Sequence, residues 1–263
     1  MNILKLFKWG NDSKKGVKVH KSSDGSHGDH WSAVFGFDDF KGNTGNALSI
    51  FVNTHKTAVF KKKITDCFAQ YRKDYGNLSF VDIRDTSNQT CTWFPALYSN
   101  RTIPVTVGEI VEWEHVDCNE AQIIGKGRDT FGLNFFATDY LENRDVYKKG
   151  GTLNISLTGF IYVIHEMKEL PKECTPDFVA YMPNQKFFSC GYEYDFIADV
   201  ISSEQIIVEE EEGYILDMKL INQTDNDSFF NMEAFVNKKN MRLENINIGQ
   251  KVTGCFWLQG RLL

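Results

Sequence analysis

The chain has 263 residues with a formal net charge of -6, 42% hydrophobic residues and 24% charged residues. This balance is typical of a folded globular protein and excludes a disordered chain. The negative charge argues against tight, charge-driven binding to nucleic acid, because that binding depends on neutralising phosphates. The run Lys61-Lys62-Lys63 is the only basic cluster, and we interpret it as the solvated face of a helix.

Six cysteines are spread along the chain, and none forms a Cys-x-x-Cys pair. Their spacing fits neither a zinc ribbon nor a thioredoxin motif, and the chain is long for a disulfide scaffold. We interpret them as reduced thiols, which predicts a cytoplasmic protein. No stretch approaches the roughly 20 apolar residues that cross a bilayer, so we expect no membrane partner.

Residues 1–30 are expected to form a flexible N-terminal segment. Residues 11–30 are rich in Ser, Gly, Asp, Lys and His, the composition of a loop or linker. In residues 1–10, apolar side chains stand between lysines. We interpret these as a frayed or docked terminus, with a short membrane-surface helix as the alternative.

Residues 31–103 predict a small α+β domain. Alternating apolar residues predict a strand at 31–37, and a second short strand follows at 47–53. Further strands are expected at 78–84 and 90–98. Between the two pairs, apolar residues recur at steps of three and four, which predicts an amphipathic helix from His55 to Tyr75 ending at Gly76. Its apolar face consists of Phe60, Ile64, Cys67, Phe68, Tyr71 and Tyr75.

The remainder of the chain is expected to be almost wholly β. A first β module spans 104–166, a linker spans 167–193 and a second β module spans 194–263. The linker holds three of the five prolines. Each module has the order strand pair, strand, polar excursion and final strand.

The predicted final strand, residues 249–260, resembles an earlier stretch, residues 156–164. Aligning Thr158-Gly159 with Thr253-Gly254 places Tyr162 on Trp257. An internal repeat of this kind suits a small OB-type barrel and equally an incomplete sandwich. The expected fold class is therefore α+β and predominantly β, with a small N-terminal α/β layer followed by two related β-barrel-like modules, OB-type or sandwich-like.

The two faces of the final strand differ in chemistry, since successive side chains alternate. One face is apolar and comprises Val252, Phe256 and Leu258. The other face sets an indole among hydrogen-bonding groups, which is how a stacking platform is built. We therefore name Trp257, Gln259, Arg261 and Tyr162 as candidate binding residues. The preferred interpretation instead buries these aromatic residues against the other module or against the N-terminal helix, and the exposure of Trp257 decides between burial and a platform.

A histidine-rich loop is the second candidate site. His27 and His30 are close enough in sequence to share a metal ion, with Asp24 as a third ligand. His-x-x-His in a glycine-rich loop lacks the rigid helix of a His-Glu-x-x-His site. The preferred interpretation is therefore a solvated loop.

No pattern of nucleophilic catalysis is present, since the chain has no Gly-x-Ser-x-Gly elbow, and no dinucleotide or phosphate-loop fingerprint occurs. We name no catalytic residue and no cofactor. The sequence favours a non-catalytic intracellular binding protein of the accessory or immunity type, with another protein as its partner. The alternatives are a barrel that binds an oligosaccharide or single-stranded nucleic acid through Trp257 and Tyr162, and a metal-dependent enzyme that uses His27 and His30.

Overall fold

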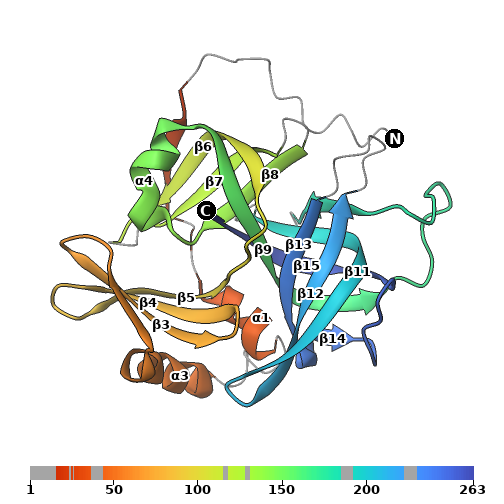
Figure 1. Cartoon of the computed structure of the whole chain (residues 1–263), viewed down its shortest axis with the longest axis horizontal. Helices are drawn as coiled ribbons and strands as arrows, with labels where there is room; N and C mark the ends of the chain where they lie inside the picture. The colour runs from red at the N-terminus through yellow and green to blue at the C-terminus, as the bar shows by residue number, and fades with distance from the viewer. Residues whose placement is uncertain are drawn as a thin grey trace.

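The computed structural model describes residues 16–23, 25, 27–36, 44–114, 118–127, 131–184, 192–221 and 230–263. The protein is predominantly β, as predicted, with one eleven-stranded sheet and a separate four-stranded sheet. Figure 1 shows the four-stranded sheet beside the two curved parts of the large sheet. No helix in the described ranges is long and apolar enough to cross a membrane.

The four-stranded sheet is an antiparallel meander from the N-terminal part of the chain. Its strands are β2 (Phe60–Lys63), β3 (Phe68–Tyr75), β4 (Leu78–Asp85) and β5 (Thr90–Leu97), in that order. Helix α3 (Thr44–Thr57) packs against β3 and β4, and it lies below the sheet in Figure 1.

The helix predicted from His55 to Tyr75 is wrong. Helix α3 ends at Thr57, and the predicted apolar face is divided between β2, β3 and the turn that joins them. Lys61 pairs with Tyr71 across this hairpin, and its Nζ atom lies 4.9 Å from the centre of the tyrosine ring. Cross-strand pairing has overridden the helical spacing, since apolar residues in two short strands can mimic a period near 3.6.

The two N-terminal strands predicted at 31–37 and 47–53 are also wrong. Residues 47–53 lie within α3, and residues 29–35 form a 3-10 turn, η2 (Asp29–Trp31), followed by α1 (Ser32–Phe35). The alternation of apolar residues at 31–37 does not indicate a strand here, because this segment is buried on more than one side. Trp31 stacks on Trp93 with ring centroids 3.5 Å apart, while α1 contacts β9 and β13 of the large sheet.

The large sheet contains all other strands of the described residues. They are β1 (Lys18–Ser22), β6 (Ile103–Trp113), β7 (Ala121–Gly127), β8 (Phe131–Ala137), β9 (Gly151–Glu166), β10 (Ala180–Pro183), β11 (Glu193–Val208), β12 (Glu211–Ile221), β13 (Phe230–Asn237), β14 (Met241–Arg242) and β15 (Lys251–Leu262). Helix α4 (Tyr140–Lys149) follows β8, where a polar excursion was expected, and the turn η3 (Lys238–Asn240) follows β13.

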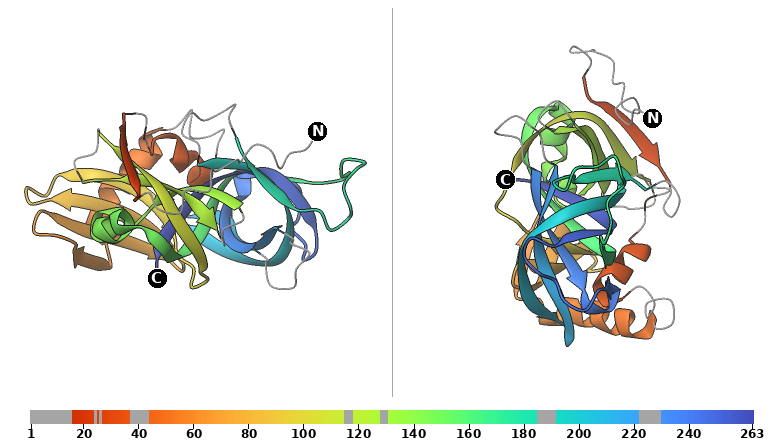
Figure 2. Two further views of the ribbon diagram at one scale, coloured as in Figure 1. Left: turned by 90° about the horizontal axis from the view of Figure 1, so that it is seen from above. Right: turned by 90° about the vertical axis from the view of Figure 1, so that its right-hand side faces the viewer.

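Strand pairing in the large sheet closes on itself twice. The first strand cycle runs β6–β7–β8–β15–β9 and back to β6. The second strand cycle runs β11–β12–β13–β9–β15 and back to β11. The left view of Figure 2 looks along the second cycle, whose blue and cyan strands curve round. Both cycles contain β9 and β15, which pair along almost their whole lengths.

The hydrogen-bond registers of the two cycles correspond. In the first cycle β6 skips one residue between Val107 and Glu109 where it pairs with β7, and in the second β11 skips one between Val200 and Ser202 where it pairs with β12. Each cycle has one parallel pair, β8 with β15 and β13 with β9. A glycine with positive φ precedes each shared strand, Gly150 at 71° and Gly249 at 80°.

Two hydrophobic cores lie on opposite faces of the shared strands. The predicted apolar face of β15, formed by Val252, Phe256 and Leu258, belongs to the core within the large sheet. Cys255 and Trp257 belong to a second core at the junction of the large sheet, the four-stranded sheet and residues 27–36. The alternation predicted for this strand is therefore confirmed. The five cysteines among the described residues form no disulfide bond with one another, and Cys190 lies outside those residues.

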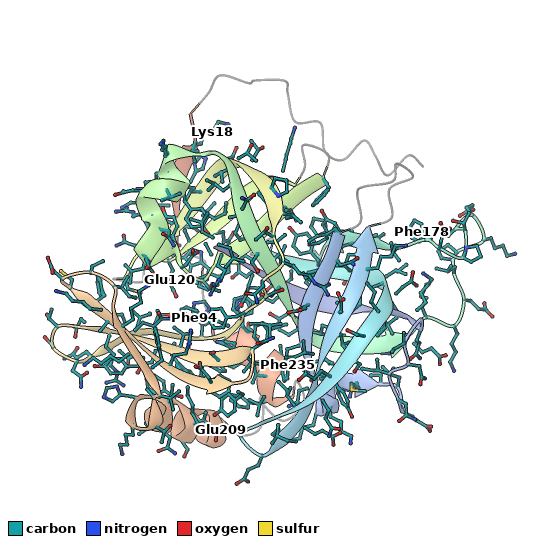
Figure 3. All side chains as sticks on the ribbon, in the orientation of Figure 1. Lys18, Phe94, Glu120, Phe178, Glu209 and Phe235 are labelled. Carbon is teal, nitrogen blue, oxygen red and sulfur yellow. The ribbon has the colours of Figure 1, made fainter. Side chains whose placement is uncertain are left out.

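The hairpin of β11 and β12 connects the large sheet to the small one. Its turn contains Glu209 and Glu210, both with positive φ. Glu209 accepts hydrogen bonds from Lys73 and Tyr75 of β3, and Figure 3 labels it near α3. The acidic turn is therefore a docking contact between the two sheets.

Candidate functional site

A cleft of about 280 Å³ lies where the four-stranded sheet meets the first strand cycle. One wall comes from β2, β3 and β5, and the other comes from β8, the start of α4 and the end of β15. Figure 3 labels Phe94 and Glu120, two lining residues that lie between the small sheet and β6–β8. The polar and charged residues that line the cleft include Lys62, Arg72, Tyr98, Glu120, Asp139 and Arg261.

Two arginines approach one tyrosine at the wall of this cleft. The guanidinium carbon of Arg261 lies 4.8 Å from the centre of the Tyr98 ring, and that of Arg72 lies 5.1 Å from it. Arg72 also lies 4.4 Å from the ring of Phe60. Such cation–π contacts stabilise a guanidinium while leaving its N–H groups available to an acceptor.

The cations of the cleft differ in their ion pairs. Lys62 is paired with Glu142, and the Nε atom of Arg72 lies 2.6 Å from a carboxylate oxygen of Asp74. Arg261 makes no ion pair with any described residue, and its Nε atom is buried without an acceptor among them. The cleft therefore contains a half-buried positive charge that the described protein does not neutralise.

Asp139 also lines the cleft but is committed to neighbouring donors. Its Oδ1 atom accepts a hydrogen bond of 2.8 Å from the hydroxyl of Tyr147, while Oδ2 accepts from Asn143 at 2.8 Å and from the backbone N–H of Leu262 at 3.0 Å. Burial raises the pKa of Asp139 despite these hydrogen bonds. Its role is to fasten the C-terminal strand to α4, next to Arg261.

Glu120 connects the cleft to the interior. Its carboxylate is buried, and Oε1 accepts a hydrogen bond of 2.8 Å from Thr92 and lies 2.9 Å from Nε2 of His27. Its Oε2 atom has no hydrogen-bond partner among the described residues. The His27 ring sits among aromatic rings, including Phe136 with centroids 4.7 Å apart.

Behind this pair lies a buried cluster centred on His30. The imidazole stacks on Trp257 with centroids 3.9 Å apart and planes 8° apart. Its Nδ1 atom is 2.6 Å from the hydroxyl of Tyr162, and Nε2 is 3.3 Å from that of Tyr192. The carboxylate of Glu193 lies 3.9 Å from Nδ1. Burial raises the pKa of Glu193 to about 8, and burial together with His27 lowers that of His30 well below its usual value.

The structure divides the four predicted binding residues between two places. Trp257 is fully buried and Tyr162 is 3% exposed, so neither offers a stacking surface to an external ligand in this conformation. Gln259 is also fully buried and ties β15 to β5, donating to the carbonyl of Pro95 at 2.7 Å. Only Arg261 reaches the cleft.

The predicted metal ligands His27 and His30 lie close together, with ring centroids 5.8 Å apart. Asp24, the third predicted ligand, lies outside the described residues. Among the described residues, no three or more ligand-type side chains are placed to hold a metal ion. The two histidines instead face Glu120 and two tyrosine hydroxyls. The metal site therefore stays a prediction without structural support.

Sequence reasoning missed Arg72, Tyr98 and Glu120. The predicted helix from His55 to Tyr75 leaves Arg72 outside its apolar face, and the predicted strand 90–98 ends at Tyr98. The three residues lie on separate segments that become neighbours only through packing of the two sheets. No local pattern marks such a set.

Comparisons with family models, curated proteins and solved structures found no match to this chain.

Proposed function

We propose that this protein is a non-catalytic binding protein whose ligand occupies the cleft between the four-stranded sheet and the first strand cycle. The observation that carries the proposal is the half-buried guanidinium of Arg261, which has no ion-pair partner among the described residues. A charge in a partly buried site is costly unless an opposite charge neutralises it. A site of this kind suits a ligand better than it suits internal packing.

The proposal includes two OB-type modules related by an internal repeat. In support, the first cycle has the order β6–β7–β8–β15–β9, with a helix between β8 and β9, and the second cycle has a matching order. The matching bulges and parallel pairs described above support the repeat. OB-type modules commonly act as binding scaffolds. When the two cycles are aligned by their bulges and strand pairs, the registers favour Thr158 of β9 as the counterpart of Trp257 in β15. The sequence predicts Tyr162 at this position.

The size of the cleft favours a small molecule. At about 280 Å³ it is near the lower end of ligand sites in proteins. A stable interface with a folded partner buries roughly 800 Å² on each side. We therefore rank a protein partner, which the sequence predicts, below a small-molecule ligand. We also rank the predicted binding platform at Trp257 and Tyr162 below the cleft, because both residues are buried.

A cleft-filling variant tests the proposal. Gln70 of β3 lines the cleft and is only half buried, so Gln70→Trp should occupy the cleft with little cost to folding. Gln89 is exposed on the β4–β5 turn, and Gln89→Trp is the matched control. Ligand-detected NMR against a small-metabolite extract should show compounds that bind the wild type and Gln89→Trp but not Gln70→Trp. If no bound compound is lost in Gln70→Trp, the cleft is not the binding site.

A further inference from the structure

The chemistry of the cleft specifies a class of ligand, and this step rests on the proposed function. We infer that the ligand is a small organic anion that also carries a hydrogen-bond donor. Arg261 binds the anionic group, and Glu120 accepts from the donor. Both residues line the same cleft, although they come from the C-terminal strand and from the loop before β7.

The guanidinium groups of the cleft are the reason to infer an anionic group at one end of the ligand. Arg261 has no ion pair with a described residue, and its buried Nε–H has no acceptor among them. Arg72, which also lies over the Tyr98 ring, adds a second positive charge that Asp74 partly offsets. The neighbouring oxygens of Asp139 already accept three hydrogen bonds. A guanidinium presents parallel N–H groups that match a carboxylate or a phosphate.

The donor end follows from Glu120. This residue is 5% exposed, and Oε1 is occupied by Thr92 and His27. Oε2 is buried with no partner among the described residues. Leaving a buried acceptor unsatisfied costs about 1–3 kcal/mol, and more for a charged group. A ligand N–H or O–H, and an ammonium group above all, would recover that cost.

The space between the two ends limits the body of the ligand. Apolar side chains complete the lining, including Phe60, Ile83, Phe94 and Phe136. A volume of about 280 Å³ holds a compact molecule with a short apolar or ring-shaped middle. Amino-bearing carboxylates and amino-bearing organic phosphates share this chemistry.

Matched probe pairs test the inference on the full chain. The first pair is ethyl phosphate and phosphoethanolamine, and the second is propionate and β-alanine. Within each pair the anion is constant and only the second compound carries an ammonium donor. Binding is measured by titration, following the Nε–Hε resonance of Arg261 in ¹H–¹⁵N spectra. The amino-bearing member should bind about tenfold more tightly, which corresponds to ~1.4 kcal/mol. The stronger pair identifies the anion as phosphate or carboxylate.

Two variants and one control assign the two ends. Arg261→Gln lacks the reporting resonance, so its binding is followed by ligand-detected NMR, and it should weaken binding of all four probes by about tenfold or more. Glu120→Gln should remove the preference for the amino-bearing member. Arg101→Gln is the control, because Arg101 is half exposed, pairs with Asp217 and lies outside the cleft lining.

The comparison of the four probes on the wild-type protein does not depend on the folding of any variant. An Arg261 resonance that no probe moves overturns the anionic end. Equal affinities within both pairs overturn the donor end. If either occurs while Gln70→Trp still displaces some metabolite, the ligand class is wrong and the binding function stands.

Discussion

The imidazole of His30 lies face to face with the indole of Trp257, 3.9 Å away between ring centroids. This contact joins the N-terminal segment to the last strand of the chain. Both rings are almost inaccessible to solvent. The aromatic face that could have received a ligand from outside is occupied by the protein's own histidine.

Replacing His30 should destabilise the junction between the sheets. His30→Ala removes the stack on Trp257 and the contacts to the hydroxyls of Tyr162 and Tyr192. We expect the free energy of unfolding to fall by about 2–4 kcal/mol, as for other large-to-small changes that leave a cavity and unpaired polar groups. Urea denaturation measures the change. His20, whose side chain is 54% exposed, gives the control His20→Ala, with a change below about 0.5 kcal/mol.

Glu193 should make the protein less stable as the pH rises from about 6.5 to 8. Burial, with a contribution from Asp29, raises its pKa to about 8 in the folded state, against an ordinary value of 4.5. Between these two values the folded state keeps a proton that the unfolded state has lost, so raising the pH favours unfolding. His30, with a lowered pKa, has the opposite effect, but only below its ordinary value of 6.5.

Between pH 6.5 and 8 the change in stability therefore reflects the carboxyl group of Glu193 without the opposing effect of His30. We expect the wild-type free energy of unfolding to fall by up to about 2 kcal/mol across it. Glu193→Gln should flatten this slope and be the more stable protein at pH 8. Glu166→Gln, at an exposed position, should keep the wild-type slope. A wild-type profile that is flat over this window would contradict a buried, protonated Glu193.

Glu112 should fasten α4 to β6. Burial alone would raise its pKa, but hydrogen bonds from Arg144, Lys148 and Tyr140 lower it to about 2. Its stabilising effect is thus present above the ordinary pKa of 4.5 and is lost as the pH falls toward 2. We expect Glu112→Gln to cost about 1–2 kcal/mol at pH 7 and much less near pH 2, measured by thermal unfolding. An equal cost at both pH values would exclude a charged role.

Two glycines near the final strand should differ sharply in their tolerance of alanine. A Cβ atom on Gly254 would lie 2.0 Å from the carbonyl oxygen of Val163, so Gly254→Ala must separate β15 from β9. We expect a loss of more than about 3 kcal/mol, or no folded protein. Gly249 has φ of 80° but open space around it, so Gly249→Ala should cost only about 1 kcal/mol. Similar melting temperatures for the two variants would contradict this packing.

The sequence predicted the final strand better than any other feature. The alternation that separates Phe256 from Trp257 is a local property, and the structure places these residues in different cores. The helix predicted from His55 to Tyr75 failed because the same apolar spacing fits two strands joined by a turn. Only the pairing of Phe60 with Arg72 and its neighbours distinguishes the two structures, and a pairing partner is not visible in a window of the sequence.

The candidate site was partly visible. His27, His30, Tyr162 and Trp257 were selected separately for their chemistry, and the fold brings them into one cluster. Their meeting depends on contacts across long stretches of chain, such as the bond between His30 and Tyr162. The cleft was not visible, since Arg261 gains its neighbours Tyr98 and Arg72 only when the two sheets pack together.

The two cycles share β9 and β15, and this sharing ties the two halves of the chain together. β9 precedes the segment 167–193 yet completes the cycle formed by β11, β12 and β13, while β15 completes the cycle formed by β6, β7 and β8. Each half therefore resembles one subunit of a strand-swapped dimer whose subunits have been joined into a single polypeptide. A cut within 167–193 would leave two fragments that each lack one strand of their own cycle and carry one that both cycles share. Such fragments should recover the native fold only by reassociating.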